Sequence, residues 1–311
     1  FKKNWVKFII MVFLFTAVTS PFVVLFGPFN NVKRAVIGAI LQSRHPQYIT
    51  WLFSNDELQS ILGTVGVVKS QDLFKFNARE DKDLKLEKIE SSRYVGYVLE
   101  IPDPRRIQVA TAANIQEKGD TTSNIAKMNG AVAAINGGGF HDPNGTGTGR
   151  LPYGFILHEG DYIIGKDVGP DESVDFVGFS KSGNLIAGNY DKTELADMKA
   201  MEGITFGPPL IVDGKKMITD GDGGWGVGPR TAIGQRKDGT VLFVVIDGRQ
   251  PGYSLGATLR DVQDVLYEKG AYIAANLDGG SSSTLYLNGK VVNKPADLLG
   301  ERMIPTAFIV K

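Results

Sequence analysis

The chain has 311 residues, of which 42% are hydrophobic and 22% charged, and its formal net charge is zero. This length and composition are enough for a full hydrophobic core and exclude a disordered chain. The balanced charge, without a long Lys/Arg block, argues against a nucleic-acid partner. Cysteine is absent, which excludes disulfides and thiolate catalysis, and the 38 glycines favour a turn-rich β-containing fold.

The N-terminal segment has the pattern of a membrane anchor. Lys2, Lys3 and Lys7 precede an uncharged stretch, Phe8–Phe26, which as a helix would span roughly 28 Å, close to the thickness of a bilayer core. A cleaved signal peptide is the alternative, but Pro21 crowds the most plausible cleavage site and favours an uncleaved anchor. The three lysines would then stay in the cytoplasm, which predicts a single-pass protein of the cell membrane with an extracellular catalytic domain.

Three regions are expected along the chain: a membrane anchor at 1–30, a helical stalk and linker at 31–90, and a catalytic domain at 91–311. The apolar spacing between residues 32 and 62 predicts helices. Residues 69–92 are rich in Lys, Asp and Glu with little periodicity, so the main boundary is placed near residue 90.

Short apolar runs separated by turn residues follow this boundary and predict β-strands. These runs are YVGYVLEI, RIQVATA, GAVAAI, YIIG, PPLIVDG, TAIGQR, TVLFVVI, AYIAANL, TLYLNG and AFIV. One helix interrupts them, in TLRDVQDVLYEKG, where Thr258 and Asp261 have the spacing of a capping box and Gly270 supplies the stop. We therefore expect an α+β fold with extended mixed or antiparallel β-sheets and a few packed helices, preceded by the N-terminal transmembrane helix.

Three of the apolar runs end in a polar residue beside glycine: Asn136 in AINGGGF, Asp247 in VVIDGR and Asp278 in ANLDGGSSS. An unpaired buried carboxylate costs several kcal/mol, so each Asp is expected either to be hydrogen-bonded or to face a cleft. A single motif of this kind is equally well explained by an Asx turn. Three together predict a shared site. The Asp-Gly and Asn-Gly pairs in VDGK, KDGT and LNGK are instead expected to be hairpin turns.

Several groups near these strand ends are candidates for anion binding. Backbone N–H groups and hydroxyls of the Gly/Ser turn at 279–283 are able to form an anion-binding nest, and Arg230 and Arg249 supply guanidinium groups that match phosphate. Trp225, in the glycine-rich loop TDGDGGWGVGP, is a candidate for stacking on a sugar. Surface salt bridges and ordinary packing are the alternatives for these three side chains.

A metal site is weakly indicated. His141 and Asp142, or Asp220 and Asp222, are candidate ligands, and DPNGTGTG loosely suggests calcium. No His/Asp cluster has a recognisable ligand spacing, so no cofactor is expected, with a divalent cation such as calcium as the alternative.

The motifs INGGGF, PRTAIGQ, VVIDGRQ, GYSLGATLRDVQDVL and NLDGGSSSTLYLNGKVVNKP occur in this order, and together they resemble the phosphodiester glycosidase family over residues 91–311. The resemblance implies hydrolysis of a sugar 1-phosphodiester between the anomeric carbon and oxygen, giving free sugar and a phosphomonoester. The matching positions are Asn136, Gly137, Gly138, Arg230, Thr231, Asp247, Arg249, Asp278, Gly279, Gly280 and Ser282. Ser281 stands where glycine is common in similar sequences.

The leading hypothesis is a membrane-anchored glycosidase in which Asp278 and Asp247 share the acid and the base or nucleophile roles. Arg230 and the Gly/Ser N–H groups would hold the phosphate, with Asn136 in the site and His141 as a substrate contact. By analogy, the expected substrate is an anionic cell-wall or capsular glycopolymer. A non-catalytic protein that binds anionic polysaccharide and a metal-dependent phosphodiesterase are the alternatives.

Overall fold

The computed structural model describes residues 2–41, 47–54, 57–58, 61, 68–70, 73–77, 80–142, 147–165, 168–297 and 299–311. The chain divides into two compact units. The first comprises Phe1–Thr64 with Gly221–Gly226, and the second comprises Val65–Asp220 with Val227–Lys311. The expected division at residues 30 and 90 stays a prediction.

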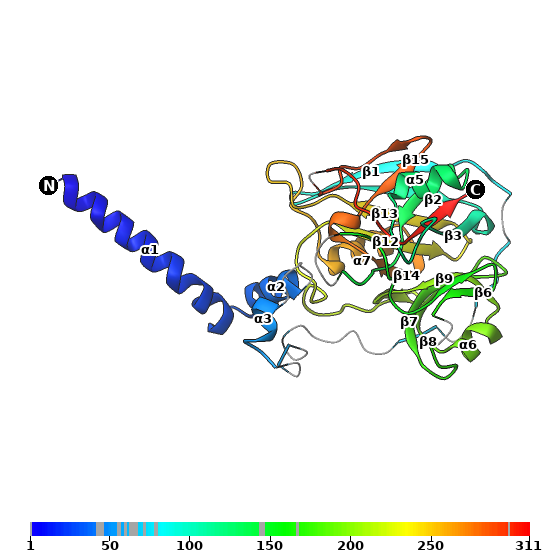
Figure 1. The fold of residues 1–311 in the computed structure, drawn as a ribbon, viewed down its shortest axis with the longest axis horizontal. Coiled ribbons are helices and arrows are strands. Elements are labelled where there is room, and N and C mark those ends of the chain that lie inside the picture. Colours follow the sequence, from blue (N-terminus) through cyan, green and yellow to red (C-terminus); the bar gives the residue numbers. More distant parts are fainter. Residues whose placement is uncertain are drawn as a thin grey trace. The chain divides into compact units, whose positions relative to one another are not determined.

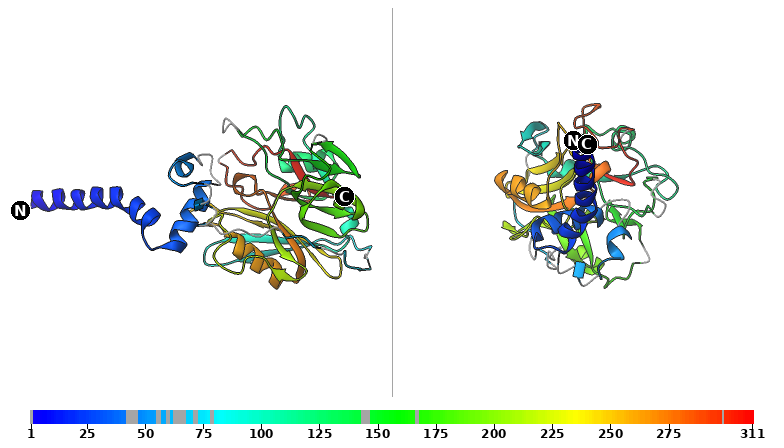
Figure 2. Two further views of the ribbon diagram at one scale, coloured as in Figure 1. Left: turned by 90° about the horizontal axis from the view of Figure 1, so that it is seen from below. Right: turned by 90° about the vertical axis from the view of Figure 1, so that its left-hand side faces the viewer.

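The first unit begins with helix α1 (Lys2–Phe26), which Figure 2 shows as one continuous helix. Its segment Asn4–Phe26 has a mean hydropathy of 2.5 and is long and apolar enough to cross a membrane. Its apolar side chains are exposed, Phe13 to 71% and Phe15 to 70%. A signal anchor and a signal peptide share these properties, so the presence of an apolar N-terminal helix is confirmed and its fate stays a prediction.

Helices α2 (Asn30–Leu41) and α3 (Gln47–Thr50) also belong to the first unit, and the described residues 57, 58 and 61 are helical as well. They form a small core in which Ile37, Ile49 and Phe53 are buried. The glycine-rich segment 221–226 packs closely here, because a Cβ atom on Gly38 would lie 2.2 Å from the carbonyl oxygen of Gly224. The helices predicted between residues 32 and 62 are thus confirmed within the described residues.

The second unit contains three β-sheets, and each neighbouring strand pair in the described chain is antiparallel (Figure 1). The first sheet has the order β1 (Lys85–Glu90), β2 (Val95–Ile101), β13 (Val241–Ile246), β12 (Arg230–Arg236), β14 (Ala271–Leu277), β10 (Pro209–Val212), β11 (Lys215–Lys216). The second has the order β16 (Lys290–Val291), β15 (Leu285–Leu287), β4 (Ala133–Asn136), β17 (Thr306–Val310), β3 (Ile107–Thr111). The third has the order β6 (Asp161–Ile164), β5 (Ile156–His158), β9 (Ala200–Thr205), β7 (Val174–Ser180), β8 (Leu185–Tyr190).

The three sheets share one hydrophobic core. Phe243 of the first sheet, Ile135 and Phe308 of the second, and Val177 and Ile204 of the third belong to the same buried cluster. Each is at most 2% exposed, and burial of one such side chain contributes about 1.5–3 kcal/mol. This common core fixes the sheets against one another and so fixes the relative positions of their strand ends.

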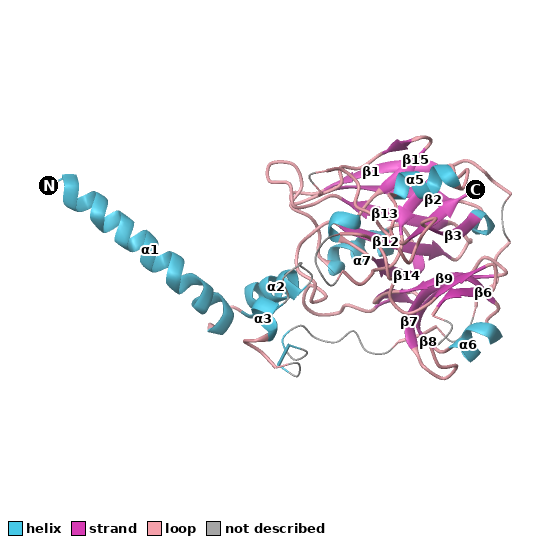
Figure 3. Cartoon of the chain, viewed as in Figure 1, coloured by secondary structure: helices cyan, strands magenta, loops and turns pink. Residues whose placement is uncertain are grey.

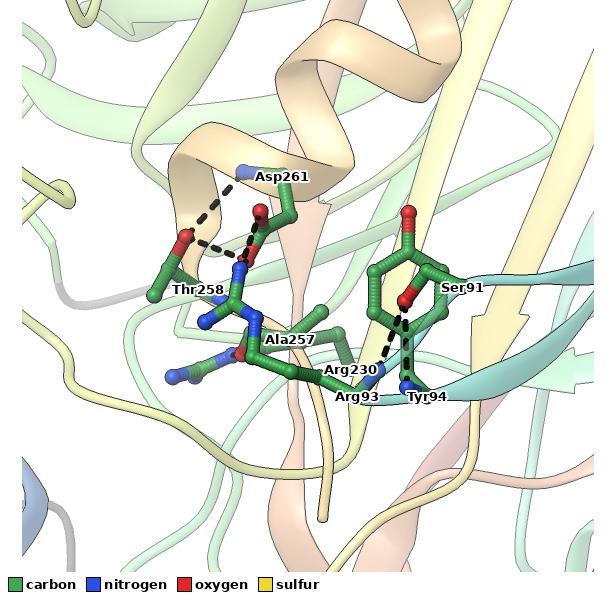
Figure 4. A network of polar contacts seen from close by, with 7 residues as sticks. All are labelled: Ser91, Arg93, Tyr94, Arg230, Ala257, Thr258 and Asp261. Atoms are coloured by element: carbon green, nitrogen blue, oxygen red, sulfur yellow. Dashed lines mark hydrogen bonds and ion pairs between the residues drawn. The ribbon is translucent and has the colours of Figure 1, made fainter. Parts of the chain in front are cut away.

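Among the described residues of the second unit, three short α-helices pack against the sheets (Figure 3): α5 (Thr122–Met128), α6 (Lys192–Asp197) and α7 (Leu259–Glu268). Helix α7 has the predicted capping box: the Thr258 hydroxyl accepts the Asp261 N–H at 3.1 Å, and the Asp261 carboxylate accepts the Thr258 N–H at 2.7 Å. Arg93 donates to the same carboxylate at 2.7 Å (Figure 4). The predicted stop is also present, since Gly270 has a φ of +82°.

The α+β prediction is confirmed, and the sheets prove to be antiparallel. All ten predicted runs contain strands, and the three predicted hairpin turns join β10 to β11, β12 to β13, and β15 to β16. The pattern analysis missed β1, which lies in the charged segment before the expected boundary at residue 91. Its Lys and Glu side chains are mostly exposed because β1 is an edge strand, and this hid its alternation.

Candidate functional site

The ends of β12, β13 and β14 meet at one edge of the first sheet. Arg230, the first residue of β12, pairs with Ile246 at the end of β13, and Thr231 pairs with Leu277 at the end of β14. The neighbouring strands are antiparallel, so the start of β12 lies beside the ends of both partners. Asp247 and Asp278, which directly follow β13 and β14, therefore come to the same edge as Arg230.

Asn136, the last residue of β4, joins the second sheet to this edge. Its Nδ2 donates to the carbonyl oxygen of Asp278 at 2.6 Å, and its Oδ1 accepts from the Thr231 hydroxyl at 2.7 Å and the Thr284 N–H at 3.1 Å. The carbonyl of Gly137 also accepts the N–H of Asp278 at 3.0 Å. Asn136 thus ties its own strand end directly to that of Asp278, whereas a site shared by all three polar strand ends stays a prediction.

Glycine at position 137 has a steric reason. A Cβ atom there would lie 2.5 Å from the Thr306 hydroxyl and 2.9 Å from the Thr306 carbonyl oxygen. The N–H of Gly138 in turn donates to the same hydroxyl at 3.1 Å. Gly137 and Gly138 thus let the chain leave β4 pressed against the start of β17, on the way to Phe140 and His141.

The carboxyl of Asp278 has the most perturbed environment of the three strand ends. Burial raises its pKa from the ordinary value of 3.8 to about 6. The Ser282 hydroxyl, the charge of Arg302, the Gly279 N–H and the charge of Arg249 act in the opposite direction. Asp278 remains partly exposed. A carboxyl with this pKa changes charge close to neutral pH, which is the property required of a group that accepts or donates protons.

Asp247 is held very differently, because its carboxylate is satisfied within the protein. It is 1% exposed and accepts hydrogen bonds from Asn293 Nδ2 at 2.9 Å, the Lys294 N–H at 3.0 Å and the Tyr253 hydroxyl at 3.0 Å. Burial raises its pKa, and the three hydrogen bonds lower it again in part. Asp247 therefore ties together two loops, 247–254 and 293–294, at the site edge.

The guanidinium groups of Arg230 and Arg249 both lie close to the loop that follows Asp278. Arg230 is 4% exposed, and its Nε donates to the carbonyl of Ala257 at 3.0 Å, just before α7 (Figure 4). Arg249 has a φ of +59°, and a Cβ atom on Gly280 would lie 3.2 Å from its Nη2. Both predicted cations are thus brought to the Asp278 loop.

The Gly/Ser turn is used differently from the expectation. The N–H of Gly280 donates to Pro229, that of Ser282 to Gly279 and that of Ser283 to Gly280, within and around the 3-10 helix η2 (Gly280–Ser282). These three N–H groups are therefore engaged within the protein, and anion binding by the rest of the turn stays a prediction. Ser281 is partly exposed, and the buried Ser283 hydroxyl has no partner among the described residues.

Two side chains near Asp278 were missed by the sequence analysis. The ring of Tyr153 is 41% exposed and packs edge-on against His141, with 4.4 Å between ring centroids. Burial, followed by the charge of Asp278, raises the pKa of Tyr153. Arg302 contacts the Phe140 ring and forms an ion pair with Asp142. Neither side chain follows an apolar strand directly, so the strand-end pattern gave no signal for them.

The remaining candidates belong to the other unit or are already engaged. Trp225 belongs to the first unit, and its role as a sugar contact stays a prediction. Asp142 accepts the Gly147 N–H and pairs with Arg302. Within the described residues, no group of three or more His, Asp or Glu side chains is arranged to hold a metal ion. The expectation of no cofactor, with a divalent cation as the alternative, stays a prediction.

Comparison with known proteins gives matches centred on this domain. The family model described as phosphodiester glycosidase matches residues 129–311. The SPbeta prophage-derived protein YomE of Bacillus subtilis (strain 168) is 32% identical over 61% of this chain and 29% of its own length. The N-acetylglucosamine-1-phosphodiester alpha-N-acetylglucosaminidase of Bos taurus is 25% identical over 59% of this chain and 36% of its own length. The chain therefore spans less than half the length of these relatives.

A solved structure supports the fold. The catalytic domain of the zebrafish N-acetylglucosamine-1-phosphodiester alpha-N-acetylglucosaminidase, auto-inhibited by its pro-peptide, superposes with a TM-score of 0.62 at 21% identity, covering 78% of this chain and 88% of that chain. The family match covers more than half of the 311 residues and contains the four strand-end residues Asn136, Arg230, Asp247 and Asp278. The chain belongs to the phosphodiester glycosidase family.

Proposed function

We propose that the second unit hydrolyses a sugar 1-phosphodiester by cleaving the bond between the anomeric carbon and its oxygen. The products are the free sugar and a phosphomonoester. Water supplies the new bond to the anomeric carbon, and the electron pair of the broken bond goes to the phosphate oxygen. Family membership and the names of the bovine and zebrafish relatives support this reaction.

The observation that carries the proposal is the partly exposed carboxyl of Asp278, which has guanidinium groups beside its loop and a pKa raised to about 6. The leaving group is a phosphomonoester, whose second pKa is about 6, so it departs as a stable anion near neutral pH with little need of a general acid. The ionised form of Asp278 then acts at the anomeric carbon, as the base that takes a proton from water or as the nucleophile.

Asp247 and Arg230 have supporting roles in this scheme. The carboxylate of Asp247 already accepts three hydrogen bonds, so its contribution is to hold the loop that carries Arg249. Arg230 is anchored through Nε to Ala257 and adds positive charge beside Gly279, where a Cβ atom would lie 3.7 Å from Nη1. Positive charge fixed in place before the reaction favours the developing phosphate dianion.

The location we propose is the outer face of the cell membrane. Helix α1 is the membrane anchor, supported by its length and its mean hydropathy of 2.5. Lys2, Lys3 and Lys7 flank it on one side and favour a cytoplasmic N-terminus. A single-pass orientation of this kind exposes the enzyme to anionic cell-wall or capsular glycopolymers, which we propose as its substrates.

Product analysis tests the reaction. Detergent-solubilised full chain is incubated with N-acetylglucosamine 1-(methyl phosphate), and the products are identified by mass. Cleavage at the anomeric carbon gives N-acetylglucosamine and methyl phosphate. Asp278→Asn is expected to lower kcat by about 10²- to 10⁴-fold, whereas Asp264→Asn, a surface variant outside the site, is the matched control and should retain the rate.

Two other outcomes would refute the proposal. Sugar 1-phosphate and methanol as products, with loss of activity in a chelator, would identify a metal-dependent phosphodiesterase. Saturable binding of a panel of wall-polymer phosphodiesters without turnover of any member would identify a binding module. Either result excludes hydrolysis of the glycosidic bond by Asp278.

A further inference from the structure

Arg302 lies in the segment that leads into β17, next to the chain that leaves β4. Its guanidinium stands over the ring of Phe140, 4.9 Å from the centroid. Phe140 follows Gly137, whose carbonyl accepts the N–H of Asp278, so the contact places Arg302 beside the loop that carries the reactive carboxyl. The side chain is only 17% exposed.

The bonding of this guanidinium is incomplete. Its Nη2 donates to Asp142 Oδ2 at 2.8 Å, and Asp142 is itself held by the Gly147 N–H at 2.9 Å. The Nε–H is buried and has no hydrogen-bond partner among the described residues. Buried polar groups in proteins are nearly always satisfied, so an orphaned guanidinium N–H at a candidate site indicates a ligand or a bound water.

The position also favours phosphate over a neutral group. Among the charged neighbours that lower the pKa of Asp278, Arg302 acts more strongly than Arg249. A planar guanidinium binds phosphate oxygens in pairs, and stacking on an aromatic ring fixes the plane of the fork before binding. Asp142 accepts a hydrogen bond from Nη2 of this guanidinium, and the Nε–H is left for a second anion.

We propose that Arg302 binds the phosphate group of the substrate and sets the preference for sugar 1-phosphodiesters over uncharged glycosides. This inference rests on the proposed function for its substrate, but it assigns a residue that the strand-end analysis did not find. The main phosphate contact is then Arg302, in the segment before β17, and not Arg230. Arg230 is only 4% exposed and is anchored to Ala257.

The first experiment measures phosphate binding without catalysis. Inorganic phosphate is titrated into the full chain by calorimetry, for the wild type, Arg302→Gln, Arg302→Lys and Arg236→Gln. Arg236 is a matched control, because it is paired with Glu100 at the far end of β12. Arg302→Gln is expected to weaken binding about 10- to 100-fold, Arg302→Lys to weaken it less, and Arg236→Gln to leave it unchanged.

The second experiment compares two substrates of one sugar. Values of kcat/KM are measured for N-acetylglucosamine 1-(methyl phosphate) and for a 4-nitrophenyl N-acetylglucosaminide, well above the pKa of Asp278, so that this carboxyl is ionised in every variant. Arg302→Gln should lower kcat/KM about 10- to 100-fold on the phosphodiester and much less on the neutral glycoside. If Arg302→Gln does not fold, Arg302→Lys decides the comparison.

The outcomes separate this inference from the proposed function. Equal losses on both substrates, or unchanged phosphate affinity in Arg302→Gln, overturn the role of Arg302. Phosphate binding that depends on Arg302, in a protein that turns over neither substrate, supports the Arg302 site and refutes the proposed reaction.

Discussion

Replacement of Asp278 by Asn should lower kcat about 10²- to 10⁴-fold and at the same time stabilise the fold at neutral pH. Burial raises the pKa of Asp278 from 3.8 to about 6, so the ionised carboxylate is disfavoured in the folded state. A shift of about two pKa units corresponds to about 3 kcal/mol. The asparagine side chain has nearly the same shape and carries no charge, so the variant is expected to gain up to about 3 kcal/mol near pH 7.

The sign of the pH dependence makes this prediction specific. Between pH 3.8 and about 6 the folded wild type holds a proton on Asp278 that the unfolded chain has released, so its stability falls as the pH rises through this window. The advantage of the Asn variant should therefore grow across the same window, stay constant above it and vanish below pH 3.8.

The assay is denaturant unfolding of the full chain in detergent, followed for both proteins across this pH range. Asp264→Asn is the matched control, since its carboxylate is 40% exposed and pairs with Lys216 at the surface, where such pairs contribute about 0–1 kcal/mol. A variant Asp278→Asn that is less stable than the wild type near neutral pH would refute the argument that burial of this charge is costly. Wild-type kcat/KM should also rise with pH and level off above about 6.

Three further substitutions test individual contacts. Asn136→Asp replaces the donor to the Asp278 carbonyl by a buried charge, so the pKa that governs wild-type activity should move upward in a pH–rate profile, and an unmoved profile would contradict this geometry. Asn293→Ala removes bonds to Asp247, Ser283 and Leu285 and should cost about 2–5 kcal/mol in the free energy of unfolding; a loss below about 1 kcal/mol would exclude Asn293 as the support of Asp247. Gly280 has a φ of +62°, and a Cβ atom there would lie 3.2 Å from Arg249, so Gly280→Ala should lower both stability and kcat/KM. Gly289 has a φ of +89° with open space around it, so the control Gly289→Ala should lower stability alone. Equal effects of the two variants on activity would show that the Arg249 contact is unimportant.

The strands were predictable from the sequence wherever their apolar pattern matches their burial in the folded protein. The runs that became β12, β13 and β14 are almost continuously apolar because these strands are buried in the middle of the first sheet. Strands β5, β7, β8 and β9 were missed, and in the last three Gly178, Gly188 and Gly203 interrupt the patterns. A Cβ atom at Gly203 would lie 2.1 Å from the Phe176 ring, so tertiary packing selects glycine there against local strand propensity.

The location of the site was predictable for a related reason. A polar residue after a buried strand must find a partner or face a ligand, and three such residues in one sequence pointed to one place. Arg302 and Tyr153 gave no such signal, because both lie on irregular connections. Only the register of β17 with β4 and the path from Gly137 to Phe140 bring these connections to Asp278.

The strand-end pattern identifies where polar groups gather, but the donors that each one meets decide its role. Asn136, Asp247 and Asp278 follow apolar strands in the same manner, yet Asp247 meets Asn293, the Lys294 N–H and Tyr253 and is fully engaged. For Asp278, loss of solvent contact is the largest effect on the carboxyl, and its pKa stays at about 6. The difference comes from two loops, 247–254 with Tyr253 and 293–294, whose donors reach Asp247. A carboxyl left short of donors at a site edge is costly to the fold, which is the reason to assign the chemistry to Asp278.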